Sequence, residues 1–173
     1  MNTSIARIIV IVAITLAVIG ITRKYIVEPI YIASESMEPT LYKSQRLFLD
    51  KFTYKTRTPL RGEVISFKSP IKDNHDSVKR VIAIASDTVQ LENKKVYLNN
   101  EPQLEFYVKY TREYEILKGD NLGPIKVPVG YLFVMGDNRD NSEDSASWKN
   151  SKTGEPLYFL DLSLVTGKVR GIF

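Results

Sequence analysis

The sequence contains no cysteine among its 173 residues and only one histidine, His75. The absence of cysteine excludes disulfides, a thiol nucleophile and zinc bound by cysteine, although it leaves the redox compartment undetermined. A single histidine allows only one candidate for a serine–histidine pair. His75 lies in a hydrophilic, turn-like stretch, residues 72–76, that is typical of a solvated loop. A histidine-based catalytic pair is therefore disfavoured, and we expect neither a metal nor another cofactor.

The chain also has little excess charge outside its first 25 residues. The formal net charge is +4, and Arg7, Arg23 and Lys24 supply three of these charges in a segment without acidic residues. The net charge of +1 that is left is too small to attract a phosphate backbone, so we expect no nucleic acid partner. With 43% hydrophobic residues, the chain is long enough for one domain with its own core.

Charged residues are nearly absent from residues 5–22, where Arg7 is the only one. Roughly 18 residues in a helix reach about 27 Å, which is close to the ~30 Å of a bilayer core. The stretch that follows holds no small-residue A-x-A cleavage site, which favours a retained anchor over a cleavable signal peptide. We predict a transmembrane helix at residues 8–24 after a short cytoplasmic segment, residues 1–7. Counting charges on the two sides does not decide the orientation.

No long amphipathic helical pattern follows the apolar segment. Short runs rich in β-branched and aromatic residues alternate instead with turn signals such as Arg61-Gly62 and Asn99-Asn100, the latter typical of a hairpin. Pro29 predicts that the first run is an edge strand. The predicted strands are residues 25–33, 46–52, 63–67, 78–85, 88–91, 95–98, 131–135 and 168–173. Residues 25–173 thus predict a predominantly β domain, with residues 103–126 as an insertion or excursion.

Two serines, Ser34 and Ser36, lie two residues apart shortly before Pro39. In an extended chain, this spacing places both hydroxyls on the same side, so one can attack a substrate while the other donates a hydrogen bond. The run lacks the glycine-flanked elbow of α/β-hydrolases. Taken alone, it fits an ordinary polar turn equally well.

Lys79 interrupts a run, residues 77–84, that is otherwise mostly apolar apart from Arg80. Burial disfavours the charged form of a lysine, and a neutral amine can accept the proton of a serine hydroxyl. An exposed pair of basic side chains on a strand edge is the alternative that this run leaves open.

A polar loop, residues 136–145 (GDNRDNSEDS), follows the predicted strand at residues 131–135. It does not fit a calcium-binding loop, because Ser145 and Ser151 stand where that pattern requires glycine and glutamate. A tight loop that hydrogen-bonds to itself and presents Ser142 and Asp144 inward is the better interpretation.

Together, these elements resemble type I signal peptidases, the serine–lysine proteases that remove signal peptides. The resemblance covers the predicted anchor and the segments SESMEPTL at 34–41, RGEVISF at 61–67, KRVI at 79–82 and VPVGYLFVMGDNRDNSEDS at 127–145. It departs from the family pattern at Glu35, Ala83 and Ser86, where glycine is expected, at Ala85, where proline is expected, and at Ala146, where an arginine often stands. It implies a signal-peptidase-like β-sheet catalytic domain with one N-terminal transmembrane helix.

The resemblance also implies roles for individual residues. Ser36 would be the nucleophile and Lys79 the general base, with the Ser142 hydroxyl orienting the lysine amine. The Ser34 side chain and the Ser36 N–H would form the oxyanion hole. Two further sets are implied: Asp144 and Arg80 as a structural pair, and Ile30, Ile32 and Val78 as the lining of shallow substrate pockets.

The expected function is therefore cleavage of exported preproteins after an A-x-A-like site. The expected location is a bacterial-type cytoplasmic membrane, with the catalytic domain on the extracytoplasmic side and the lipid bilayer as a partner. Two alternatives stay open: a peptidase dedicated to one exported substrate, and a catalytically silent, membrane-anchored accessory protein. The membrane segment and the absence of a DNA-binding module disfavour a self-cleaving repressor.

Overall fold

The computed structural model describes residues 3–71 and 75–171, and after its first helix it is predominantly β, as predicted. The elements in chain order are α1 (Thr3–Tyr25), β1 (Val27–Tyr31), β2 (Arg46–Asp50), α2 (Thr53–Thr56), β3 (Val64–Lys68), β4 (Asp76–Ala83), β5 (Thr88–Glu92), β6 (Lys95–Leu98), β7 (Glu101–Pro102), β8 (Leu122–Lys126), β9 (Tyr131–Met135), η1 (Arg139–Asn141), β10 (Leu160–Asp161), η2 (Leu162–Leu164) and β11 (Val165–Arg170).

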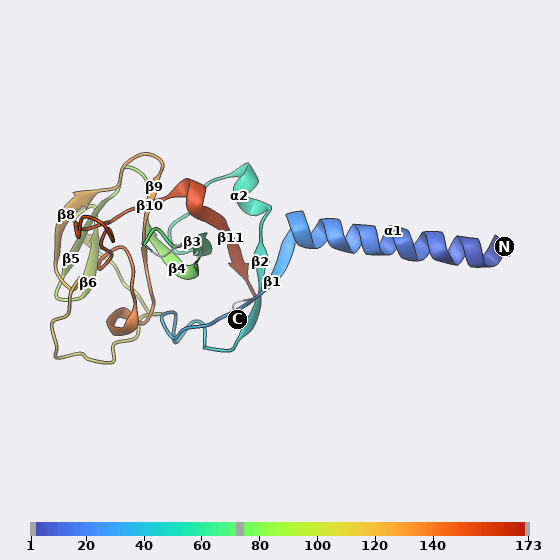
Figure 1. The fold of residues 1–173 in the computed structure, drawn as a ribbon. Helices are drawn as coiled ribbons and strands as arrows, with labels where there is room; N and C mark the ends of the chain where they lie inside the picture. The colour runs from blue at the N-terminus through green and yellow to red at the C-terminus, as the bar shows by residue number, and fades with distance from the viewer. Residues whose placement is uncertain (1–2, 72–74, 172–173) are drawn as a thin grey trace.

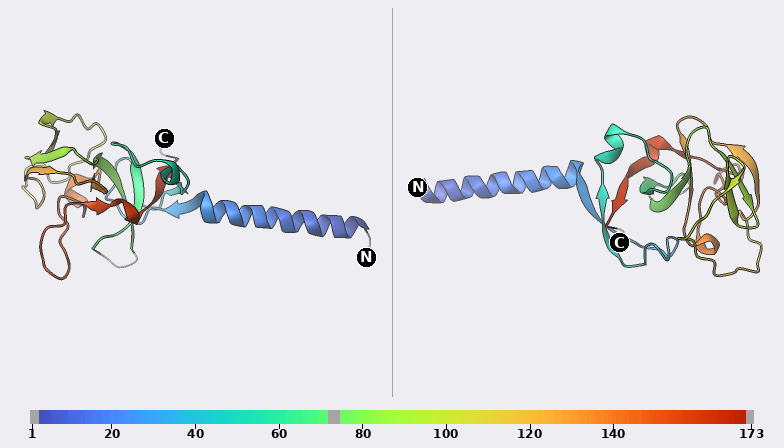
Figure 2. Two further views of the ribbon diagram at one scale, coloured as in Figure 1. Left: turned by 90° about the horizontal axis from the view of Figure 1, so that it is seen from above. Right: turned by 180° about the vertical axis from the view of Figure 1, so that it is seen from behind.

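The helix α1 projects away from the rest of the molecule in every view (Figures 1 and 2). Large apolar side chains along it, from Ile5 to Ile21, are exposed. Over the described part of the chain, no helix has both the length and the apolarity that a membrane crossing requires. The transmembrane anchor at residues 8–24 therefore stays a prediction.

A seven-stranded sheet, in the order β1-β2-β11-β3-β4-β9-β10, carries Lys79 and Arg80 on β4, and the segment with Ser36 connects its first two strands. Every neighbouring pair is antiparallel, so β1 and β4, which have three strands between them in this order, run in the same direction. β1 is an edge strand, as predicted, and its Pro29 lies opposite Phe48 of β2. Proline is tolerated there because an edge position needs no second hydrogen-bonded neighbour.

A smaller, four-stranded sheet, in the order β7-β6-β5-β8, lies at the end of the molecule opposite α1 (Figure 1). The predicted hairpin at Asn99-Asn100 is confirmed, because Leu98 of β6 pairs with Glu101 of β7. Both asparagines have positive φ, 53° and 71°, a conformation that this residue type tolerates better than most. The segment predicted as an excursion has no strand before Leu122, and its last five residues form β8, which pairs with β5.

Within residues 3–71 and 75–171, apolar side chains pack in three clusters, and one of them supports the segment that holds Ser36. This cluster contains Met37 and Leu41, together with Leu47 of β2, Val64 of β3 and Val169 of β11. The predicted strands all appear, with ends that match or differ by up to three residues. The turn at residues 72–74 and the last two residues of the predicted strand at 168–173 lie outside the described part of the chain.

Candidate active site

Ser36 lies in a turn between β1 and β2. The N–H of Leu41 donates to the carbonyl of Met37 at 2.8 Å and closes the turn. The side chains of Met37 and Leu41 are buried and fix it to the core. Ser36 is itself only 7% exposed, so the packing of its neighbours determines where its hydroxyl lies.

The two serine hydroxyls do lie on the same side, because Ser34 Oγ and Ser36 Oγ are 3.2 Å apart and hydrogen-bonded. The reason differs from the one the sequence suggested. The chain bends at Ser34 and turns at Ser36 instead of staying extended. Ser34 is exposed while Ser36 is buried, so the outer residue is accessible to solvent and the inner one is enclosed by the protein.

Lys79 lies on β4, opposite Ile65 of β3. Its side chain is buried, at 5% exposure, and its Nζ donates a hydrogen bond of 2.7 Å to Ser36 Oγ. The alternative of an exposed basic pair is therefore wrong for this residue. Burial removes water from the amine, which disfavours its charged form and favours the form that can accept a proton.

Ser142 lies in the loop that follows β9, beside the same depression as Ser36 and Lys79. Its Oγ is buried and has no hydrogen-bond partner among the described residues, so the implied contact with the lysine amine is not made in this structure. A Cβ at position 136 would overlap both Ser142 Oγ and the carbonyl oxygen of Ser36. Only glycine at this position lets the loop lie directly against the serine turn.

The predicted pair between Arg80 and Asp144 is wrong. Arg80 instead forms a two-pronged ion pair with Asp137, from Nε to Oδ1 at 2.9 Å and from Nη2 to Oδ2 at 2.6 Å. Adjacent residues of a strand face opposite sides, so Arg80 points away from the side that Lys79 uses. Asp144 accepts hydrogen bonds from the N–H groups of its own loop, those of Gly136 at 2.9 Å and Ala146 at 3.2 Å.

The loop at residues 136–145 holds the serine turn through contacts that the sequence did not reveal. The Thr40 hydroxyl donates to Asp137 Oδ2, and the Asn138 N–H donates to the Ser36 carbonyl at 3.1 Å. Asp137 and Asn138 are almost fully buried. These contacts join residues about 100 positions apart, so no local pattern could have indicated them.

The irregular segment before β8 packs over this loop. The ring of Tyr107 lies 4.0 Å from the Arg80 guanidinium, and its hydroxyl donates to Glu105 at 2.8 Å. Burial raises the pKa of Tyr107, and Glu105 raises it further, so the phenol stays neutral. Glu105 also forms a buried ion pair with Arg139 at 2.6 Å. The segment predicted as an excursion is thus attached to the site by polar contacts.

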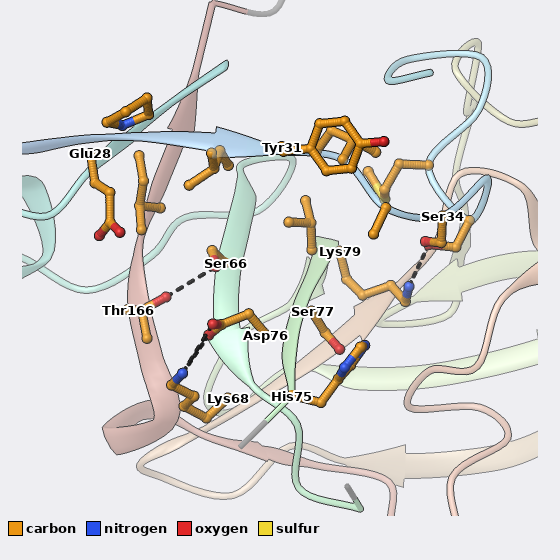
Figure 3. Close-up of a pocket in the computed structure, with 18 of the residues that line it drawn as sticks. Glu28, Tyr31, Ser34, Ser66, Lys68, His75, Asp76, Ser77, Lys79 and Thr166 are labelled. Carbon is orange, nitrogen blue, oxygen red and sulfur yellow. Dashed lines mark hydrogen bonds and ion pairs between the residues drawn. The ribbon is translucent and has the colours of Figure 1, made fainter. Parts of the chain in front are cut away.

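A groove of about 820 Å³ leads to Ser36 and Lys79. One wall is β1 and the other is the first half of β4, while residues of β2, β3 and β11 form its floor (Figure 3). The three residues expected to shape pockets, Ile30, Ile32 and Val78, all line it. His75 also lines the groove and is exposed. Within residues 3–71 and 75–171, no group of histidine, cysteine, aspartate or glutamate side chains is placed to hold a metal ion.

A model of the signal peptidase family, peptidase S26, matches residues 5–173. The chain belongs to this signal peptidase family. It is 37% identical over 138 residues to signal peptidase I P of Bacillus subtilis subsp. natto. The matched region covers 78% of this chain and 74% of that relative. It is 40% identical over 135 residues to a probable signal peptidase I-2 of Synechocystis, covering 75% of this chain and 59% of that relative.

A crystal structure of a signal peptidase I from Enterococcus faecalis is 25% identical and has a TM-score of 0.49, covering 66% of this chain and 98% of that one. Membership of the signal peptidase family rests on the sequence matches. It makes this chain a serine endopeptidase and implies preproteins with signal peptides as substrates. It also implies a membrane-associated enzyme with an extracytoplasmic catalytic domain.

Three of the departures from the signal peptidase pattern are accommodated by local backbone geometry and hydrogen bonds. Ser86, at a position where glycine was expected, has a φ of +77°, so the turn keeps a conformation that usually favours glycine. Asp87 stabilises this turn by accepting the Ile84 N–H at 3.0 Å. The side chain of Glu35 is exposed, and its carbonyl accepts a hydrogen bond from Asn138 at 3.2 Å. Ala146 donates its N–H to Asp144, which needs no arginine to be satisfied.

Proposed function

We propose that Ser36 is the nucleophile and Lys79 the general base of this signal peptidase. The observation that carries the proposal is the 2.7 Å hydrogen bond between a buried amine and a buried hydroxyl. A neutral Lys79 accepts the Ser36 proton as the oxygen attacks the scissile carbonyl, and the resulting ammonium then protonates the departing amine. Water cleaves the acyl-enzyme by the same proton transfers in the reverse direction.

The developing oxyanion is stabilised by the Ser36 N–H and the Ser34 hydroxyl in this proposal. Ser34 Oγ, exposed and 3.2 Å from Ser36 Oγ, is placed to donate to an oxygen bonded to the attacked carbon. Ser142 orients the Lys79 amine once a substrate occupies the site. Catalytic hydrogen bonds often form only in the substrate complex, which agrees with the unpartnered Ser142 Oγ.

The substrate is an extended signal peptide lying in the groove between β1 and β4. The free edge of β1 can pair with it as an added strand. Ile30, Ile32 and Val78 line the groove near the dyad. In this proposal they limit the side chains that fit there to small ones, which gives an A-x-A-like preference. Asp144 and Arg80 support the site separately, one within the loop at 136–145 and the other through Asp137.

The proposal places α1 in a lipid bilayer as a single-pass anchor. Residues 1–7 then lie in the cytoplasm, and residues 25–173 lie on the extracytoplasmic side of the membrane. The exposed apolar side chains along α1 support this placement, because water would solvate them poorly. Fractionation of cells that express the full chain should recover it in membranes, and carbonate extraction should not release it. Recovery of the chain in the soluble fraction would contradict the anchor.

Variants of the full chain in detergent test the dyad. We expect Ser36→Ala and Lys79→Ala each to lower cleavage of a preprotein with an A-x-A site by at least about 10³-fold, since each removes a group that takes part in bond making. His75→Ala is the matched control, because it changes an exposed residue of the same groove. Full activity in Lys79→Ala would exclude the mechanism.

A further inference from the structure

The lining of the groove changes character along its length. Beside the dyad, apolar side chains line it, Ile30 of β1 and Val78 of β4. Further away, side chains with hydroxyl and charged groups replace them, and Figure 3 shows these gathered on the side away from Ser34 and Lys79. The polar floor consists of Ser66, Lys68, Asp76 and Thr166.

Strand register gives the distance between the apolar side chain of Val78 and the charged pair of Lys68 and Asp76. Ser66 lies opposite Val78, and Lys68 lies opposite Asp76, two residues further along both strands. Residues two apart on a strand share a face and are about 6.6–6.8 Å apart. One such step therefore leads from the apolar pocket at Val78 to the charged pair.

The polar floor is built to meet a hydrogen-bonding side chain. Ser66 is only 4% exposed, and its Oγ accepts the Thr166 hydroxyl at 3.0 Å. Among the described residues, no acceptor is recorded for the Ser66 proton. Lys68 Nζ and Asp76 Oδ1 are 2.9 Å apart and keep half of their side-chain surface in contact with solvent. An apolar side chain placed here would strip water from these groups without replacing its hydrogen bonds.

The opposite wall is charged at the same end of the groove, where Glu28 of β1 forms an ion pair with Lys51. β1 and β4 run in the same direction, and α1 ends at Tyr25, immediately before β1. A signal peptide whose apolar core lies in the bilayer beside α1 enters the groove from this end. The residues that precede the cleaved bond then lie along the groove, with the earlier ones nearer to Glu28.

We propose that Lys68 and Asp76, at the far end of the polar floor, form a subsite that selects a polar, hydrogen-bonding side chain at the fifth residue before the cleaved bond. This inference rests on the proposed function. In an extended peptide, the first, third and fifth residues before that bond face the same side. The first and third meet the apolar side chains at Ile30 and Val78, and the fifth, one step further, meets Lys68 and Asp76.

Matched peptides test the subsite. They carry an A-x-A site and differ only at the fifth residue before the cleaved bond, which is glutamine in one and leucine in the other. With the full chain in detergent, we expect kcat/KM to be about tenfold higher for the glutamine peptide. Glutamine can form one or two hydrogen bonds with the subsite, whereas leucine removes water from its charged groups without replacing the lost hydrogen bonds. The same exchange at the second residue, which faces away from the floor, should change kcat/KM less than about twofold.

The double variant Lys68→Met/Asp76→Leu removes the charges as a pair and should reduce the tenfold preference to less than about threefold. The control is Glu92→Leu/Lys95→Met, because these exposed residues also lie opposite each other on neighbouring strands, β5 and β6. The control should keep the wild-type preference. Equal preference in the wild type and the Lys68/Asp76 variant would overturn the subsite alone. A wild type that cleaves no peptide would overturn the proposed function and the subsite with it.

Discussion

The two sheets of this protein are both antiparallel, yet they use their buried positions differently. In the four-stranded sheet, buried residues alternate regularly with less buried ones and are apolar, as at Val89, Leu91, Val96 and Leu98. In the seven-stranded sheet, the buried positions include Ser66 and Lys79. Because burying a polar group without a partner costs free energy, polar residues inside the larger sheet indicate chemistry, whereas the smaller sheet shows only packing.

A substitution in the smaller sheet should separate packing from catalysis most clearly. Leu98→Ala should lower the free energy of unfolding by about 2–4 kcal/mol, since it leaves a cavity beside Val89 and Val127. Chemical denaturation measures this loss. Well below the melting temperature, kcat should stay within about twofold of the wild type, because Leu98 is not among the residues that line the groove. A large fall in kcat would show that the smaller sheet also positions the dyad.

Ser142→Ala should show the opposite behaviour in the loop that follows β9. The Ser142 hydroxyl has no hydrogen-bond partner among the described residues, so its removal should leave the unfolding free energy unchanged or slightly raised. Activity should fall by about 10–100-fold, because the lysine amine loses its orienting group in the substrate complex. Threonine at this position keeps the hydroxyl and should restore part of kcat. Equal loss of stability and activity in the alanine variant would indicate a packing role instead.

The smallest expected effect concerns pH and Asp50, at the end of β2. Burial raises the pKa of Asp50, but hydrogen bonds from Thr53, Arg170 and the Phe52 N–H outweigh burial and lower this pKa to about 2. Because the folded pKa lies below the ordinary value of 3.8, the stabilisation is present above about pH 4 and is lost as the pH falls toward 2.

Asp50→Asn should therefore lower the unfolding free energy by about 1–2 kcal/mol at pH 6 and by much less at pH 2.5. Urea unfolding at the two pH values measures the difference. Glu92→Gln, an exposed change on β5, is the control and should shift the unfolding free energy by less than about 0.5 kcal/mol at both. A deficit for Asp50→Asn that is the same at both pH values would show that the charge of Asp50 contributes nothing.

Much of the β fold could be predicted from local patterns. Pro29 indicated the edge strand, and Asn99-Asn100 indicated the hairpin, because each depends on the backbone preferences of a few neighbouring residues. β8 was missed because its residues, LGPIK, contain glycine and proline and carry no strand signal. The partner of Arg80 was also mispredicted, since two aspartates of one loop, Asp137 and Asp144, are equally plausible partners until the loop is folded.

The sequence by itself determined which side chains were candidates: two serines two residues apart, a lysine within an apolar run, and a polar loop after a strand. Tertiary structure decided which of them meet. The 2.7 Å contact between Lys79 and Ser36 joins residues 43 positions apart, through the pairing of strands and the packing of Met37 and Leu41. Such a contact depends on the whole sheet. Strand register and core packing bring the two side chains together, and local sequence preferences do not.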